Sequence, residues 1–112
     1  ALLVLPKDPS SVPEVQQADM VAVLKVLKVE VENVDIILTG LVLMRYLAQR
    51  QENQKRMSSS NAVSLVLQAL HLHDSHPTLQ GVACDALGNL LQDQANADQF
   101  LAQRGVDAVF SV

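Results

Sequence analysis

The apolar residues of this chain follow a helical pattern that returns after 43 residues. Met20, Val23, Leu24 and Leu27 fall at positions i, i+3, i+4 and i+7, the spacing of one face of an α-helix. The same spacing recurs 43 residues later in Val63, Val66, Leu67 and Leu70, and it begins a third time with Val106, Val109 and Phe110. A helical pattern with a period in the forties predicts stacked helical units, each burying its apolar face on its neighbours.

The displacement of 43 residues also aligns identical residues along the chain without a gap. The identical pairs are Val23 and Val66, Leu24 and Leu67, Leu27 and Leu70, Leu47 and Leu90, Gln49 and Gln92, Gln51 and Gln94, Asn53 and Asn96, Val63 and Val106, and Val66 and Val109. Conservative matches include Gly40 with Ala83 and Met57 with Phe100. Such an array forms a surface for another protein and rarely catalyses a reaction.

Six helical segments follow from the pattern. They cover about 13–30, 33–49, 51–60, 62–73, 77–92 and 95–103, and Gly105 is expected to break the last. In the second segment we expect the apolar residues Ile36, Ile37, Leu43, Met44 and Leu47 to face inward. Gly40 lies mid-way along it, where glycine costs about 1 kcal/mol relative to alanine, so we expect a neighbouring helix to approach closely there. Pro77 suits the first position of the fifth segment.

The domain organisation predicted from these segments is one array of repeated units. Residues 1–12 form an apolar stub and a turn-rich linker, 13–50 a first unit, 51–93 a complete unit, and 94–112 the start of another. The chain begins without Met and stops within an apolar helical pattern, so we expect it to be a fragment of a longer array.

Composition and charge indicate the kind of core, the partners that are not expected, and the cellular compartment. Hydrophobic residues make up 49% of the 112 residues and aromatic residues only 3%, so the core must be aliphatic. A net charge of −4 and a pI near 5.1 argue against a nucleic-acid partner. No apolar stretch is long enough for a membrane span, so no membrane partner is expected. The single Cys84 fits a reducing compartment, which favours an intracellular protein of the cytoplasm or nucleus.

The unit that opens at Asn53 has a short polar helix, a medium apolar helix and a long helix with small residues in its middle. The chain resembles the armadillo-repeat family over about residues 14–112. The matching residues are Asn53, Val63, Val66, Leu67, Leu70, Leu79, Ala83, Ala86, Leu87, Asn89 and Leu90, the last six within the run LQGVACDALGNLL, followed by Asn96, Phe100, Leu101, Gly105 and Val106. HEAT repeats are the nearest alternative, but the extra short helix and the Gly105 corner favour armadillo.

The resemblance implies an all-α, right-handed solenoid of about two and a half repeats, whose third helices line a concave groove for extended peptides. In the importin-like branch a groove Asn pairs with the partner's backbone, and Asn89 occupies that position. Asp85 stands where that branch has a Trp, and the equivalent pair in the preceding repeat is Val42 and Tyr46. The chain contains no Trp, which argues against basic nuclear-localisation peptides as partners.

The sequence therefore predicts a non-enzymatic protein–protein interaction module that needs no cofactor and no metal. The residues expected to contact a protein or peptide partner are Tyr46, Gln49, Asp85, Asn89 and Gln92. Alternatively, Asn89 faces solvent or caps a neighbouring loop, and Tyr46 packs against a flanking helix. For the whole chain the alternative is a structural spacer, or a segment that self-associates through its exposed terminal repeats.

Two further features suggest chemistry only weakly. His71, His73, Asp74 and His76 form an H-x-H-D-x-H cluster, which allows a zinc hypothesis although its spacing matches no established site. Exposed histidines of a loop between two helices are the more ordinary interpretation. Cys84 has no identifiable base to activate it, so we expect a small, semi-buried packing residue rather than a nucleophile.

Overall fold

The computed structural model describes residues 11–103, and this part of the chain contains six α-helices and no strand. The helices are α1 (Gln17–Val29), α2 (Val34–Leu47), α3 (Gln51–Ser59), α4 (Ala62–Leu72), α5 (Pro77–Leu90) and α6 (Gln94–Ala102). The all-α class predicted from the sequence is confirmed. None of these helices is both long and apolar enough to cross a membrane. The stub at the N-terminus, the Gly105 corner and the third apolar stripe lie outside the described residues.

The boundaries of the helices recur at the displacement found in the sequence. Adding 43 to the limits of α2 gives the limits of α5, and adding 43 to the limits of α3 gives the limits of α6. The helix starts recur as well. Asn33 Oδ1 accepts a hydrogen bond from Ile36 N at 3.3 Å, and 43 residues later His76 Nδ1 accepts one from Leu79 N at 3.1 Å. Each bond satisfies an N–H group that the first turn of a helix leaves without an intrahelical partner.

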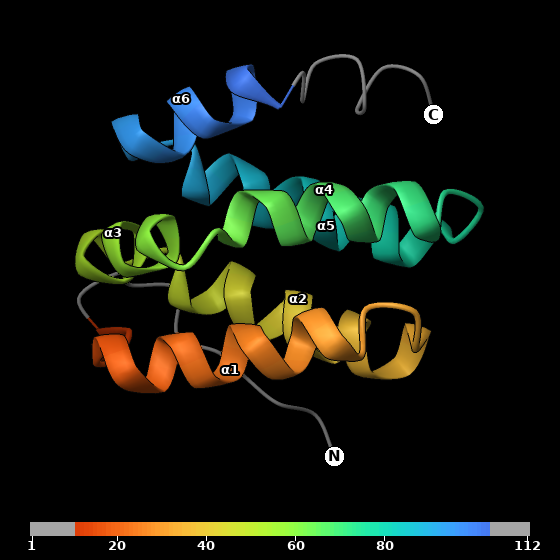
Figure 1. Cartoon of the computed structure of the whole chain (residues 1–112), viewed down its shortest axis with the longest axis horizontal. Helices are drawn as coiled ribbons and strands as arrows, with labels where there is room; N and C mark the ends of the chain where they lie inside the picture. The colour runs from red at the N-terminus through yellow and green to blue at the C-terminus, as the bar shows by residue number, and fades with distance from the viewer. Residues whose placement is uncertain (1–10, 104–112) are drawn as a thin grey trace.

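Helices with the same place in the pattern lie next to each other. In Figure 1, α1 and α4 run across the front of the molecule, and α2 and α5 lie behind them. The contact between α2 and α5 is the most extensive in the described chain, and α1 packs on α4 as α3 packs on α6. The core between them is aliphatic, as the composition predicted, and includes Ile37, Leu41 and Met44 of α2.

Two residues of α2 that were expected to face inward do not. Ile36 and Leu43 are exposed, at 38% and 40%, whereas Ile37, Leu41 and Met44 are buried. The buried stripe lies within the stack, where α2 packs on α5. The stripe with Ile36 and Leu43 lines an open groove with Val23 of α1, and no helix of the described chain covers it. The expectation was wrong because an apolar residue is buried only where a second element covers it.

Gly40 allows the close approach that the sequence predicted. A Cβ atom built on Gly40 would lie 2.3 Å from Leu27 Cδ2 and 2.6 Å from Leu27 Cδ1, so the α1 side chain occupies the space of the missing methyl group. Gly81 and Gly88 of α5 differ, because a Cβ atom on either would meet no atom within 4 Å.

This contrast predicts that substitution by alanine stabilises the protein at Gly81 and Gly88 but not at Gly40. Gly81→Ala and Gly88→Ala should each raise the free energy of unfolding by about 0.5–1 kcal/mol, because alanine loses less backbone entropy in a helix interior. Gly40→Ala should bring no such gain, because Leu27 must move to accommodate the methyl group. Urea unfolding followed by circular dichroism measures all three. An equal gain at Gly40 would contradict the packing of Leu27 on α2.

Candidate partner-binding site

Asp85 and Asn89 lie one turn apart on α5, and both contact Arg45 of α2. Asn89 Nδ2 donates a hydrogen bond to the backbone oxygen of Arg45 at 2.9 Å, and Arg45 Nη1 lies 3.5 Å from Asp85 Oδ2. The Asp85 side chain is 66% exposed, so this ion pair is screened by solvent and contributes at most about 1 kcal/mol. The structure thus places these two predicted residues on the same side of α5, beside the end of α2.

The bond from Asn89 has a local cause at the C-terminal end of α2. Gln49 N donates to Tyr46 O, three residues earlier, at 3.3 Å. In a regular α-helix it would donate to Arg45 O, four residues earlier, so the Arg45 oxygen lacks its usual backbone partner. The Asn89 amide supplies that partner from the neighbouring helix. Asn89 therefore joins α2 to α5. Among the residues that the structure describes, its Oδ1 atom and second amide hydrogen have no further hydrogen bond, so they can make another contact.

The other three predicted residues have different surroundings. Tyr46, which precedes Asn89 by 43 residues, is half-buried and packs against the aliphatic core. Gln92 is exposed, and its Oε1 atom accepts a hydrogen bond from Gln54 Nε2 of α3 at 3.2 Å. Gln49 is half-buried. Asp85 and Asn89 thus meet at Arg45, whereas Gln92 is tied to the start of α3.

The expectation that Cys84 is a semi-buried packing residue was wrong, because Cys84 is exposed on α5. Its counterpart 43 residues earlier is Leu41, which is fully buried in the core that α2 forms with its neighbours. Within residues 11–103 no long helix follows α5, so the corresponding side of α5 has no equivalent cover. Gly81, Asp85 and Gly88 are exposed on the same helix, so α5 offers an open surface with little side-chain bulk.

Two buried asparagines hold the short helices α3 and α6 in place through hydrogen bonds that the sequence pattern did not predict. Asn53 is completely buried. Its Nδ2 atom donates to Leu47 O at 3.0 Å and Pro13 O at 2.8 Å, and its Oδ1 atom accepts from Val15 N at 2.8 Å. Asn96, its counterpart in α6, donates to Leu90 O at 3.0 Å. The identity of these residues at the 43-residue displacement was the available signal.

Two of the three histidines of the H-x-H-D-x-H cluster have structural partners. His73 Nε2 lies 2.8 Å from the backbone oxygen of Val31, and His76 Nδ1 caps α5 through Leu79 N. His71 is exposed on α4. Among residues 11–103, no three His, Cys, Asp or Glu side chains are grouped so as to hold a metal ion. The geometry therefore gives the zinc hypothesis no support.

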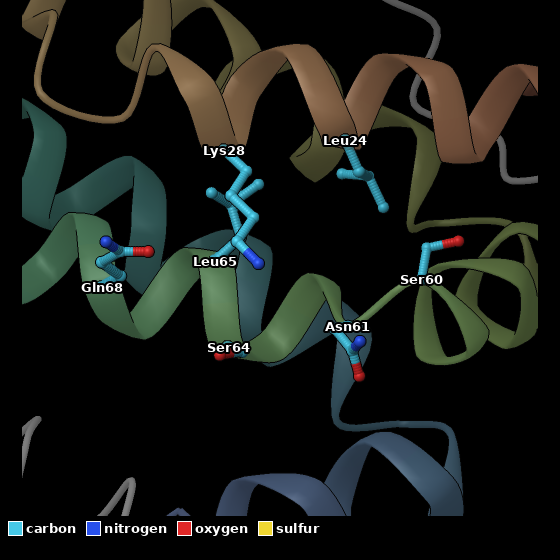
Figure 2. Close-up of a pocket in the computed structure, with 7 residues that line it drawn as sticks. All are labelled: Leu24, Lys28, Ser60, Asn61, Ser64, Leu65 and Gln68. Carbon is cyan, nitrogen blue, oxygen red and sulfur yellow. The ribbon is translucent and has the colours of Figure 1, made fainter.

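A small pocket between α1 and α4 is also a weak candidate for a ligand. Figure 2 shows Leu24 and Lys28 extending from α1 toward α4, whereas Asn61 and Ser64 point away from α1. The pocket holds about 80 Å³, which suits a few water molecules rather than an organic ligand.

Comparisons with known proteins assign no family to this chain. A scan against protein-family models, a search of curated proteins and a search of solved structures each found no match.

Proposed function

We propose that this chain is an armadillo-type helical repeat segment that acts as a protein–protein interaction module. The partner is a peptide segment in an extended conformation that lies across α2 and α5 and contacts Tyr46, Gln49, Asp85, Asn89 and Gln92. No catalytic step, cofactor or metal is part of this function. The proposal places the protein among scaffolds whose specificity comes from a few exposed side chains on a rigid helical surface.

The observation that carries the proposal is the shared contact of Asp85 and Asn89 with Arg45. It fixes an acidic side chain and an amide side chain one turn apart on a surface formed by two adjacent helices. An extended peptide exposes alternating backbone N–H and C=O groups. The Oδ1 atom of Asn89 can accept from the N–H groups, and its second amide hydrogen can be donated to the C=O groups. Gly81 and Gly88 leave room for that backbone to approach α5.

Charge defines the chemistry of the expected partner. The chain has a net charge of −4, and Asp85 is a strongly exposed carboxylate at the proposed contact. A partner with Lys or Arg near this position would gain attraction from Asp85, although Arg45 neutralises part of the charge. We therefore expect peptides with one or two basic residues rather than long basic runs.

The test is selection of binding peptides from a random library, followed by affinity measurement on variants of the protein. Asp85→Lys should weaken selected peptides about tenfold, because one attraction is lost and one repulsion is added. The matched control is Asp74→Lys, an equal change of charge at an exposed position between α4 and α5. It should change affinity less than twofold. Equal losses in both variants would show non-specific attraction and would contradict the proposed site.

The spacer alternative has one specific observation in its favour. The groove beside α1 and α2 is apolar and has no cover within the described chain, which is a feature of helices that stack on further elements. Spacer and peptide-binding functions use different surfaces of the protein, so one does not exclude the other.

A further inference from the structure

A mostly apolar groove lies on the outside of α1 and α2. It has a volume of about 420 Å³, and its lining residues are Val23, Leu27, Asp35, Ile36, Thr39, Gly40 and Leu43. Val26 stands beside it on α1 in an adjoining hollow and is 58% exposed. We call the side chains of Val23, Val26, Ile36 and Leu43 the open aliphatic face. Exposed apolar residues that gather in this way mark an interaction surface rather than a random feature of the exterior.

The 43-residue displacement shows what such a face looks like when it is covered. The counterparts of the open aliphatic face are Val66, Ala69, Leu79 and Ala86, and all four are 0% exposed. These residues belong to α4 and α5, on which α1 and α2 pack. The same positions of the pattern are therefore closed by a neighbouring helix pair in one place and open in the other.

Other exposed apolar residues of α1 do not share this property. Val29 is 75% exposed, and its counterpart Leu72 is exposed as well. Val21 is exposed, and so is its counterpart Ser64. Exposure of the open aliphatic face is therefore specific to positions that a neighbouring helix pair covers in α4 and α5. The displacement separates them from apolar residues that are merely on the surface.

The polar groups of the groove are arranged so that it can be covered. Thr39 lies at the position of Val82, which is buried in α5, and Thr39 Oγ1 already donates a hydrogen bond to Asp35 O at 2.9 Å. Covering Thr39 therefore leaves no hydroxyl donor without a partner. Asp35 lies at the position of Thr78, which is exposed, so its charge would stay at the edge of the contact.

We propose that the open aliphatic face is a stacking interface for a further helical unit of the same 43-residue kind, joined ahead of α1. That unit would pack on α1 and α2 as these helices pack on α4 and α5, and it would continue the interface that already exists within the chain. This inference goes beyond the proposed function, because it concerns another surface and its test uses no peptide.

The test extends the full chain by duplicating residues 17–59 in tandem after residue 59. The insert contains α1, α2 and α3 and keeps the displacement of 43 residues, so the second copy of α1 follows α3 as α4 does. Val26→Lys is then made in the second copy of the extended protein and, separately, in the original protein. Val29→Lys at the corresponding positions is the matched control.

The original protein should tolerate Val26→Lys with a change in Tm below about 2 °C, because the site is exposed. In the extended protein the same substitution should lower Tm by roughly 5–10 °C, because it buries an ammonium group under the added helices. Val29→Lys should have little effect in both proteins. If the extended protein tolerates Val26→Lys, or fails to unfold as one cooperative unit, the proposed stacking is wrong.

Two other occupants would overturn the proposal and give different results. If a second copy of the chain covers the face, sedimentation equilibrium will show a dimer of the original protein that Val26→Lys dissociates and Val29→Lys does not. If residues 1–10 cover it, Val26→Lys will destabilise the original protein, and deletion of those residues will abolish that effect. A monomeric original protein that is insensitive to Val26→Lys supports the stacking unit.

Discussion

Asn53→Ala should lower the free energy of unfolding by about 3 kcal/mol, a large effect for a polar residue. The substitution leaves two backbone oxygens, of Leu47 and Pro13, and one backbone N–H group, of Val15, without the side-chain partner that each has now. The Leu47 oxygen keeps its hydrogen bond from Arg50 N at 3.2 Å, so the main loss falls on Pro13 O and Val15 N. Each unsatisfied buried group costs about 1–3 kcal/mol, and relaxation or entry of water at the partly exposed end reduces the sum. Urea unfolding at constant pH measures the loss.

The chain provides a graded control for this substitution. Asn96 occupies the same place in α6, but within residues 11–103 its Oδ1 atom has no hydrogen-bond partner, so Asn96→Ala removes fewer bonds and should cost about 1–2 kcal/mol. Gln51 is exposed in α3, and Gln51→Ala should cost less than about 0.5 kcal/mol. Equal losses for Asn53→Ala and Gln51→Ala would show that Asn53 does not fasten the preceding segment to α3.

Leu41→Ala should destabilise the protein by about 3 kcal/mol, within the range seen for fully buried leucines. Leu41 is 0% exposed and belongs to the buried stripe of α2, so its truncation leaves a cavity beside the most extensive helix contact of the fold. The matched control is Cys84→Ala at the position 43 residues later. Cys84 is exposed, and its replacement should cost less than about 0.5 kcal/mol.

The comparison of Leu41 with Cys84 tests how the helices are stacked. Both residues occupy the same place in the repeated pattern, and they differ in whether another helix pair covers them. Similar losses for both substitutions, measured by urea unfolding, would contradict the arrangement in which α2 is covered on the side where α5 is open.

The sequence was sufficient to predict the helices, because their signals are local. The apolar spacing of Met20, Leu24 and Leu27 and the helix-starting residue Pro77 act within one or two turns. The six observed helices accordingly begin and end within a few residues of the predicted limits. Gly40 was also interpretable, because glycine in a helix interior requires a compensating contact, and Leu27 provides it.

Burial could not be predicted in the same way, because it depends on which neighbour is present. Ile36 and Leu43 are as apolar as their buried counterparts Leu79 and Ala86, so composition does not distinguish a covered face from an open one. Cys84 was misjudged for the same reason. A capping role was one expected alternative for Asn89, but its acceptor, the Arg45 oxygen, could not be predicted, because it depends on the hydrogen bonds of the last turn of α2.

The most direct test of the account is whether α2 and α5 lie side by side in solution at the predicted displacement. Nuclear Overhauser contacts of side-chain amide protons in the isotopically labelled protein measure this. We expect contacts from the Asn89 amide to the backbone of α2 near Arg45, and from the Gln99 amide of α6 to Ser58 of α3. Asn89 and Gln99 amides that contact only their own helices would contradict the stacked arrangement, and the two proposals that depend on it would fail.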